Sequence, residues 1–323
     1  MDILITGNCG YVGSIMTDLF LKEGHKVIGY DILMHGKEHM IHFEDNENYE
    51  FHKGDTRDFD KIEPLIEKSD VVVHLAAIPR VDDCLDIEPE MYEINSNASI
   101  EIARLCLKHD KKIVFASTCS VYGMLEDDNE ITEESEANPT TIYAKTKAEA
   151  ELGIQRLCPD ALICRFATAY GFSPRMRYDL FINEVTRDAY VKKKIELFDP
   201  KVWRCFINTK DMARGVLFLL KNDKSGIYNI GSNDQNVNKT KIVDSIKNEI
   251  GDFQIDILRE KKDPRDYRIN FDKITNLGFS IEKEIQTGIK DMVEHLSLPG
   301  INPYDIKYTN YKKLPERFVK DSS

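Results

Sequence analysis

A glycine-rich turn near the start of the chain constrains the fold more than any other feature. The turn has the spacing G-x-x-G-x-x-G and lies between the apolar run Ile3–Ile5 and a helix expected over Tyr11–Glu23. In a strand–turn–helix context this pattern is typical of a dinucleotide-binding βαβ unit, whereas glycines alone would be weakly informative. Glycines let the backbone approach a pyrophosphate, and the helix N-terminus offers it free N–H groups. We therefore expect the whole turn to contact a dinucleotide: Gly7, Asn8, Cys9, Gly10, Tyr11, Val12 and Gly13.

An acidic residue follows the next apolar segment. The run Lys26–Tyr30 predicts a second strand, and Asp31 stands where a carboxylate is expected to bind the adenosine ribose. Because a carboxylate repels a 2′-phosphate, Asp31 favours NAD over NADP. Gly54-Asp55 follows a third strand and is a candidate for the adenine end, although Asp55 is also a common turn residue. The residues expected at this end of the cofactor are Asp31, Ile32, Asp55 and Thr56.

Strands and helices alternate over the first half of the chain. The expected strands are Ile3–Ile5, Lys26–Tyr30, Tyr49–Phe51, Val71–Leu75, Ile113–Ala116 and Ala161–Arg165, and the expected helices are Tyr11–Glu23, Phe59–Lys68, Met91–His109 and Tyr143–Leu157. Alternation of this kind predicts right-handed βαβ units and a parallel sheet. We predict an α/β fold with a Rossmann-type, doubly wound parallel sheet over residues 1–170, to which segments near 203–232 return.

The pattern loosens after Tyr170, and a smaller C-terminal lobe is expected over residues 171–323. Helices are expected there at Leu180–Lys192, Lys239–Ile250 and Ile281–His295, and a strand at Gly226–Gly231. The end of the chain from Tyr304 is polar and is interpreted as a loosely docked tail.

Composition narrows the class of protein. A chain of 323 residues with 41% hydrophobic and 31% charged residues is typical of a soluble globular protein. The net charge of −12 disfavours nucleic-acid binding. There is no apolar run long enough to cross a bilayer and no leader-like start, so we expect a cytoplasmic protein without a membrane partner.

Seven cysteines without a C-x-x-C pair indicate reduced thiols. His35, His39 and His42 are interpreted as solvated, and no metal site is expected.

Two side chains near the start of the helix expected at Tyr143–Leu157 have the spacing of an acid/base pair. Tyr143 and Lys147 stand at i and i+4 and therefore share one face. An ammonium beside a phenol favours the phenolate, so we expect Lys147 to lower the pKa of Tyr143. A tyrosine tuned in this way can act as an acid or base near neutral pH. The alternative is an exposed pair of no chemical importance.

The stretch A-S-T-C-S-V-Y-G, residues 116–123, places hydroxyls and a thiol after an expected buried strand. Cys119 or Ser120 would suit a nucleophile, but the chain has no G-x-S-x-G elbow, and a hydrolase would leave the glycine turn unexplained. We therefore favour a hydrogen-bonding role, with Thr118 as the residue concerned.

Together these motifs resemble the extended short-chain dehydrogenase/reductases, in the nucleotide-sugar epimerase/dehydratase group. The resemblance covers most of the chain and includes Gly7/Gly10/Gly13, Asp31, Gly54-Asp55, His74–Ala77, Asn95, Thr118 with Val121–Gly123, Tyr143/Lys147, Arg165, Tyr170-Gly171, Arg204–Ile207, Asp211 and Tyr228–Gly231. It implies that the smaller lobe binds the substrate and that the catalytic residues are Thr118, Tyr143 and Lys147. It also implies that Tyr143 and Lys147 touch the cofactor, together with Leu75, Ala76, Ala77 and Asn95. The implied substrate-binding residues are Thr118, Thr168, Arg175, Arg204 and Arg265, of which Arg204 and Arg265 resemble diphosphate-binding arginines.

The function implied by the resemblance is NAD-dependent hydride transfer at C4 of a nucleotide-diphosphate sugar, by a 4-epimerase or a 4-dehydrogenase. The dehydratases of this group carry an Asp-Glu pair after the triad threonine, where this chain has Cys119 and Ser120, so elimination of water is disfavoured. Many of the epimerases carry Asn in place of Thr168. The alternatives are a 4-keto sugar reductase and, from another class, a non-catalytic NAD-binding sensor. A homodimer is expected by analogy.

Overall fold

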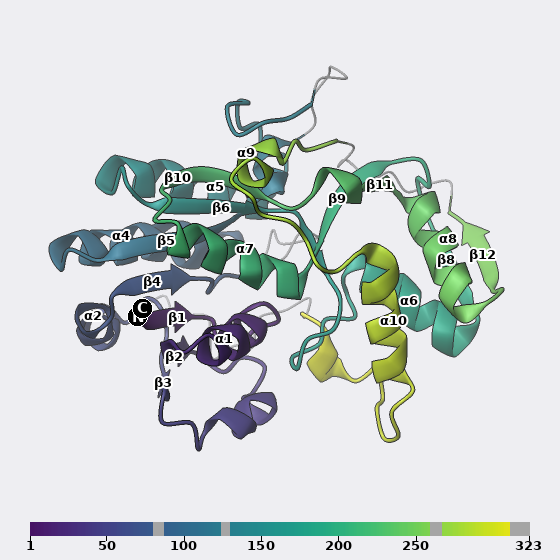
Figure 1. Cartoon of the computed structure of the whole chain (residues 1–323), viewed down its shortest axis with the longest axis horizontal. Coiled ribbons are helices and arrows are strands. Elements are labelled where there is room, and N and C mark those ends of the chain that lie inside the picture. Colours follow the sequence, from purple (N-terminus) through teal and green to yellow (C-terminus); the bar gives the residue numbers. More distant parts are fainter. Residues whose placement is uncertain (80–86, 124–129, 259–266, 311–323) are drawn as a thin grey trace.

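Seven parallel strands form the main sheet of the computed structural model, which describes residues 1–79, 87–123, 130–258 and 267–310 (Figure 1). The strands lie in the order β10 (Gly226–Ile230), β6 (Leu162–Phe166), β5 (Lys112–Thr118), β4 (Val71–His74), β1 (Asp2–Thr6), β2 (Lys26–Asp31) and β3 (Tyr49–Lys53). The predicted Rossmann-type sheet is therefore confirmed. The order of the strands reverses between β1 and β4, which is where a doubly wound sheet leaves a crevice for a ligand.

The register brings the carboxyl ends of the central strands level with one another. Thr6 at the end of β1 pairs with Tyr30 on β2 and with His74 on β4. The segments that follow these strands therefore leave the sheet at the same edge. The glycine turn, Asp31 and Leu75 consequently meet, although long stretches of sequence separate them.

Helices cover both faces of the sheet. Because side chains alternate along a strand, Ile3 and Ile5 pack on one face and Leu4 packs on the other. The face of Ile3 is covered by α1 (Gly13–Lys22) and α7 (Thr209–Lys221), and the face of Leu4 is covered by α2 (Phe59–Lys68), α4 (Ala98–Lys108) and α5 (Ile142–Leu157). Both faces are buried, which explains the continuous apolar run Val71–Val73 in β4.

Several boundaries differ from the sequence predictions. The single helix expected over Met91–His109 is α3 (Glu88–Tyr92), a π-helical turn η3 (Glu93–Asn97) and then α4. Strand β5 continues to Thr118 instead of ending at Ala116. The last long helix, α10 (Ile285–Leu296), begins four residues later than expected, because the Asp211 carboxylate accepts the N–H groups of Glu282 and Lys283 at 2.9 and 2.8 Å and holds them outside the helix.

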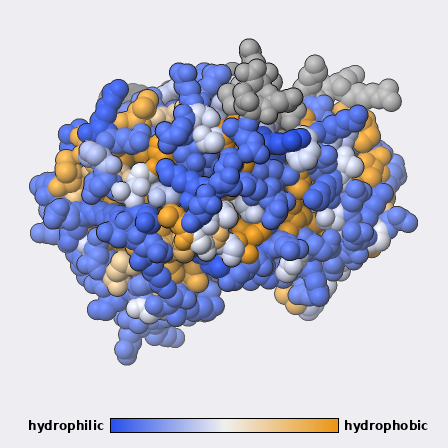
Figure 2. Space-filling view, turned by 45° about the horizontal axis from the view of Figure 1, so that its top comes forward, coloured by the Kyte–Doolittle hydropathy of each residue, from blue (hydrophilic) through white to orange (hydrophobic). Residues whose placement is uncertain are grey.

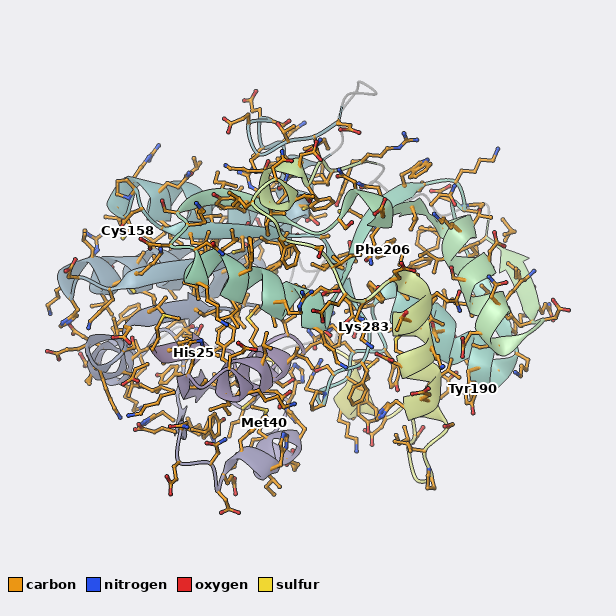
Figure 3. The ribbon with its side chains drawn as sticks, in the orientation of Figure 1. His25, Met40, Cys158, Tyr190, Phe206 and Lys283 are labelled. Atoms are coloured by element: carbon orange, nitrogen blue, oxygen red, sulfur yellow. The ribbon has the colours of Figure 1, made fainter. Side chains whose placement is uncertain are left out.

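A second group of elements packs around its own apolar cluster, at the right of Figure 1. It includes α6 (Phe181–Lys192), β8 (Lys194–Leu197), α8 (Lys239–Ile250), β12 (Gln254–Ile257) and α10. A separate three-stranded sheet has the strand order β11 (Asn236–Asn238), β9 (Trp203–Asn208) and β7 (Thr168–Tyr170). Phe206 of β9 and Tyr190 of α6, labelled in Figure 3, belong to this second cluster. The assignment of residues 1–170 and 171–323 to cofactor and substrate binding stays a prediction.

Short elements complete the fold: the single-turn helix α9 (Asp272–Thr275) and the 3₁₀ turns η1 (Glu38–Phe43), η4 (Cys119–Tyr122), η5 (Asn233–Gln235) and η6 (Ile306–Tyr308). Of the segment from Tyr304 onward, the described part is not loosely docked. The Tyr304 ring lies 4.5 Å from the Arg187 guanidinium, and its hydroxyl donates to the Asp188 carboxylate at 2.9 Å. The expectation of a loose tail is therefore wrong for residues 304–310.

Hydrophilic residues cover most of the face in Figure 2, and hydrophobic ones appear there in small groups. No helix in the described part of the chain is long and apolar enough to cross a membrane.

A buried ion pair ties α5 to the main sheet. Arg165 on β6 and Glu151 on α5 are 2.7 Å apart at Nη2 and Oε2, and their side chains are 6% and 3% exposed. The Ser117 hydroxyl of β5 donates to the same carboxylate, and the Arg165 guanidinium lies over the Tyr122 ring. Such a pair fixes geometry, because either charge left alone in this interior would be uncompensated.

We predict that Glu151→Ala lowers the free energy of unfolding by about 3–5 kcal/mol, because it leaves the buried Arg165 cation without its anion. Asp18→Ala is the control, since it breaks the exposed Lys22–Asp18 pair and is expected to cost at most about 1 kcal/mol. Urea unfolding followed by circular dichroism measures both variants. Equal losses in the two would contradict the prediction.

Candidate functional site

A cavity of about 670 Å³ opens at the carboxyl edge of the main sheet. Most of the residues predicted for cofactor, substrate or catalysis line it: Gly7, Gly10, Tyr11, Val12, Gly13, Asp31, Ile32, Asp55, Thr56, Leu75, Ala76, Ala77, Thr118, Tyr143, Lys147, Thr168, Arg175 and Arg204. The register of the sheet therefore assembles residues from across the chain into one space. Arg265 lies outside the described residues.

The glycine turn is a cradle that side chains would fill. Gly7 has a φ of +72°, and a Cβ there would lie 2.9 Å from the backbone of Ala76. A Cβ on Gly13 would lie only 2.1 Å from the Gly7 carbonyl oxygen. The turn thus brings the first turn of α1 against the end of β1, and most residues of the turn line the cavity. This arrangement fits a pyrophosphate.

Asn8 and Cys9, predicted to contact the cofactor, build the turn and do not line the cavity. The buried Asn8 amide donates to the Tyr49 hydroxyl at 2.8 Å. The Cys9 backbone N–H donates to the Asp31 carboxylate at 3.1 Å. These two residues therefore link the glycine turn to β3 and to the end of β2.

Asp31 is held by backbone donors on both of its oxygens. Leu33 N–H donates to Oδ1 at 2.7 Å, and Cys9 N–H donates to Oδ2. Burial raises the pKa of Asp31, and these two hydrogen bonds oppose the rise. Each oxygen keeps a further lone pair, so the carboxylate can accept ribose hydroxyls. Asp55 also lines the cavity, and it binds the Arg57 guanidinium through both oxygens.

Asn95 does not line the cavity, and it supports the cavity wall instead. It stands in the π-helical turn η3, where its side chain accepts from the Ile78 N–H at 2.8 Å. Its amide donates to the Ile78 carbonyl and to the Thr146 hydroxyl, both at 3.2 Å. Asn95 thereby joins the segment after β4 to the first turns of α5.

The sequence suggested that His35, His39 and His42 are all solvated, but the structure shows that they are not. His35 lines the cavity, and burial together with the Arg175 and Arg177 charges lowers its pKa to about 3. A ring nitrogen of His39 lies 2.9 Å from the Cys9 carbonyl oxygen. The described residues contain no group of three side chains suited to hold a metal ion.

Thr118, Tyr143 and Lys147 meet at the cavity from two elements. Thr118 ends β5, and its hydroxyl accepts from the Ser120 N–H at 3.1 Å. Tyr143 and Lys147 lie in the first turns of α5, which Thr141 caps by accepting the Ala144 N–H at 3.2 Å. The cap fixes where the helix starts, and hence where both side chains face the cavity.

Lys147 is a buried cation, and its ammonium has no hydrogen-bond partner among the described residues. Its Nζ lies 4.4 Å from the centre of the Phe115 ring. Burial lowers the pKa of Lys147 to about 7, and the Glu151 charge opposes the fall. A group with this pKa changes its charge near neutral pH, as an acid/base site requires.

The expected effect of Lys147 on Tyr143 is not met in this structure. Burial raises the pKa of Tyr143 to about 12, and the cation that opposes the rise is Arg177. Removal of the phenol from water outweighs the attraction of this cation. The pair shares the cavity as predicted, but its pKa values are set by burial.

Thr168 and Arg204 form the part of the cavity wall built by the three-stranded sheet. Arg204 on β9 donates from Nη2 to the Thr168 hydroxyl on β7 at 3.1 Å. The lining residues that were not predicted include Met34, His35, Arg177, Leu180, Met212 and Asn310. Arg177 stands two residues after the predicted Arg175, but nothing near Asn310 in the sequence marks it as a site residue.

The chain matches known proteins over most of its length. The sequence model of the NAD dependent epimerase/dehydratase family matches residues 3–231. The chain belongs to this family. It is 31% identical over 307 residues to a putative UDP-glucose 4-epimerase of Methanocaldococcus jannaschii, covering 90% of this chain and 97% of that protein. It is 30% identical over 295 residues to a UDP-glucuronate 4-epimerase of Thermodesulfobacterium geofontis, covering 84% of each.

A solved structure agrees with this membership. The dTDP-glucose 4,6-dehydratase of Bacillus anthracis, in complex with NAD, superimposes with a TM-score of 0.79 at 25% identity, covering 91% of this chain and 96% of that one. The family and the glycine cradle both indicate the same cofactor. The protein is an NAD-dependent enzyme of the extended short-chain dehydrogenase/reductase type.

We predict that Gly13→Ala abolishes NAD binding and costs at least about 1–3 kcal/mol of stability, because its Cβ would overlap the Gly7 carbonyl. Gly24→Ala is the matched control. Its Cβ would have nothing within 4 Å at a φ of +78°, so it should cost about 1–2 kcal/mol and keep NAD affinity. Calorimetric titration with NAD and thermal unfolding measure the two effects. Unchanged NAD binding in Gly13→Ala would refute the assignment of the glycine turn as the NAD-binding site.

A second prediction concerns the stability of the cofactor-free protein. The pKa of Lys147 is about 7 when folded against a usual 10.5, so between these pH values the unfolded chain binds more protons and folding becomes more favourable as pH rises. Lys147→Met removes this dependence. The variant should therefore unfold at a higher temperature than wild type near pH 7, by a margin that shrinks toward about pH 10.

The exposed Lys145, on the same helix, provides the control for this measurement. Thermal unfolding of Lys145→Met across the same pH range should follow wild type. A margin between Lys147→Met and wild type that stays constant, or that grows with pH, would show that Lys147 is not the group concerned.

Proposed function

We propose that the protein transfers a hydride at C4 of a nucleotide-diphosphate sugar and acts as a 4-epimerase. The observation that carries this proposal is that Thr118, Tyr143 and Lys147 line the same cavity as the glycine turn. A proton donor or acceptor, a cation and a hydroxyl therefore face the space next to the cofactor cradle. The two relatives described above are named as 4-epimerases, which supports reaction at this carbon.

Each residue has a defined task in this scheme. When bound on the glycine turn, NAD would supply the hydride chemistry, in which the C4 hydride leaves the sugar and is later returned to C4 on the opposite face. The Tyr143 phenol oxygen takes the proton from the C4 hydroxyl and later returns one. In this scheme a charged Lys147 ammonium favours the phenolate, although burial holds the Tyr143 pKa at about 12 in the cofactor-free structure. The Thr118 hydroxyl orients the reacting oxygen by a hydrogen bond. Fixed orientation and hydrogen-bonded charge supply most of the rate in such a site.

The charge distribution in the cavity supports epimerisation over dehydration. Among the described lining residues the carboxylates are Asp31, at the end of β2, and Asp55, in the segment that follows β3. Next to Thr118 stand the buried Cys119 thiol and the Ser120 hydroxyl. Elimination of water needs an acid/base carboxylate at that place, and neither side chain supplies one.

The substrate class is tested with sugars that carry deuterium at C4. UDP-glucose, UDP-glucuronate and dTDP-glucose are incubated with the enzyme and NAD and then analysed by mass spectrometry and NMR. A 4-epimerase gives an isomer of unchanged mass that keeps the deuterium. Stoichiometric NADH would indicate a dehydrogenase, and loss of water a dehydratase. NAD binding without turnover of any sugar would favour a non-catalytic sensor. The homodimer and the cytoplasmic location stay predictions.

We predict that Tyr143→Phe lowers turnover by at least about a hundredfold, because the phenyl ring cannot exchange a proton with the sugar oxygen. Its affinity for NAD should remain close to that of wild type. Tyr190→Phe, on α6 and outside the cavity lining, is the matched control and should keep full turnover. Steady-state rates on the substrate found above measure both. Near-normal turnover in Tyr143→Phe would remove Tyr143 from the mechanism.

A further inference from the structure

The loop between β7 and α6 is fastened to the glycine turn. The Tyr11 hydroxyl donates to the Gly171 carbonyl at 2.6 Å, and the Ser173 hydroxyl donates to the Tyr11 carbonyl at 2.7 Å. These bonds join residues about 160 positions apart in the sequence. Arg175, two residues after Ser173, lines the same cavity as the glycine turn.

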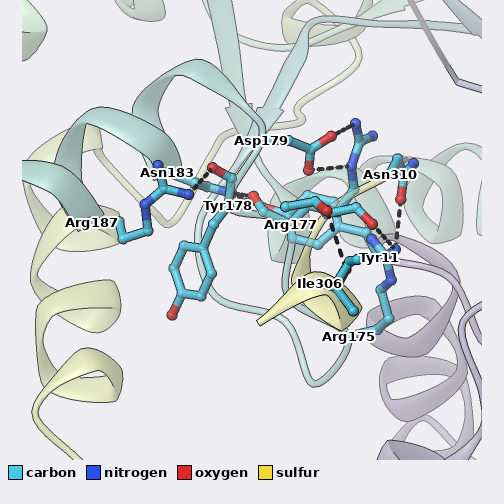
Figure 4. Close-up of polar contacts among 10 residues, drawn as sticks. Tyr11, Arg175, Arg177, Tyr178, Asp179, Asn183, Arg187, Ile306 and Asn310 are labelled. Atoms are coloured by element: carbon cyan, nitrogen blue, oxygen red, sulfur yellow. Dashed lines mark hydrogen bonds and ion pairs between the residues drawn. The ribbon is translucent and has the colours of Figure 1, made fainter. Parts of the chain in front are cut away.

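Arg175 is a buried cation with incomplete bonding. It is 3% exposed, and its Nη2 donates to the Thr309 carbonyl at 3.2 Å and to the Asn310 side-chain oxygen at 2.6 Å (Figure 4). Both acceptors are neutral. Its Nε is buried without a hydrogen-bond partner, and the guanidinium makes no ion pair with any described residue. A buried charge of this kind is unfavourable unless an anion reaches it.

The neighbouring arginine shows the contrast. Arg177 also lines the cavity, but Asp179 binds it through both oxygens, with Nη2 and Oδ2 2.6 Å apart. Burial and the Arg177 charge lower the pKa of Arg175 to about 10. Arg177 is therefore already neutralised by the protein, whereas Arg175 is left for a ligand.

The groups around Arg175 indicate which ligand it meets. The Arg175 charge lowers the pKa of Asp31 and of His35, so both side chains lie near the Arg175 guanidinium. Asp31 ends β2 and His35 follows it, on the side of the cavity where a carboxylate is suited to the adenosine ribose. Arg177 also acts on His35, and it is the cation that acts on Tyr143. Together with the hydrogen bond that ties Ser173 to the glycine turn, these contacts favour the cofactor phosphates as the anion that Arg175 meets.

We propose that the Nε of Arg175 donates a hydrogen bond to a phosphate oxygen of the dinucleotide on the glycine turn, while Thr309 and Asn310 hold the guanidinium in place. Thr309 and Asn310 thereby take part in cofactor binding, although they are far from the glycine turn in the sequence. This proposal rests on NAD binding alone and is independent of the C4 chemistry. It changes the expected role of Arg175 from the substrate to the cofactor.

The test compares ligands with and without phosphate, by calorimetric titration of the full chain. For Arg175→Ala we expect NAD and ADP affinity to fall at least about tenfold, as for loss of a charge-assisted hydrogen bond, while adenosine affinity stays unchanged. Asn310→Ala should lower NAD and ADP affinity in the same direction by a smaller factor, because the guanidinium keeps its charge but loses its fixed position. Arg175→Lys should not restore wild-type affinity, because an ammonium cannot reproduce the planar donor set.

Arg187→Ala is the control for removing a buried arginine, since Arg187 binds Asp188 and the Tyr178 carbonyl and does not line the cavity. It should leave NAD affinity unchanged, and thermal unfolding verifies that each variant is folded. Unchanged NAD and ADP affinity in folded Arg175→Ala would overturn the proposal. So would a loss confined to UDP binding by the NAD-loaded enzyme, which would place Arg175 at the substrate.

Discussion

The close approach of two glycines is the constraint on which the rest of this structure depends. Gly13 packs so near the Gly7 carbonyl that no side chain fits between α1 and β1. This contact brings the N-terminus of α1 to the sheet edge where Asp31 and Leu75 also emerge. The parallel register then determines which distant segments surround the cofactor, because each strand delivers its following loop to the same edge.

The cavity concentrates positive charge within an acidic protein. The chain carries a net charge of −12, yet Lys147 and Arg175 are both buried at this cavity without an anionic partner in the described structure. Elsewhere buried arginines are neutralised within the fold, as Arg165 is by Glu151. The difference is physical: a paired cation fixes the architecture, whereas an unpaired one destabilises the empty protein and favours an anionic ligand. Ligand binding and folding stability are thus coupled through the same two side chains.

The sequence predicted those parts of the site that depend on local pattern. The glycine turn, Asp31 and the Tyr143/Lys147 pair are marked by residue type and spacing, and the structure brings them to one cavity. Asn8 and Cys9 could not be separated from their neighbours in this way, because only the fold shows that they bond to Tyr49 and Asp31. Asn310 was missed because its contact with Arg175 spans 135 positions and leaves no periodic trace. The pKa of Tyr143 was misjudged because spacing reports a neighbouring charge but not the loss of water.

The Ser/Thr-rich stretch at the end of β5 shows how burial decides between chemistries that a sequence leaves open. Cys119 is 2% exposed, and its thiol donates to the Arg165 carbonyl at 3.4 Å. Burial raises the pKa of Cys119 well above its usual value, so a thiolate nucleophile is unavailable there. Thr118, one residue earlier, lines the cavity with its hydroxyl next to the Ser120 N–H. Cys119 begins η4 and is absent from the cavity lining, so of these two residues Thr118 serves the cavity, and its hydroxyl can orient an oxygen but cannot attack as a thiolate.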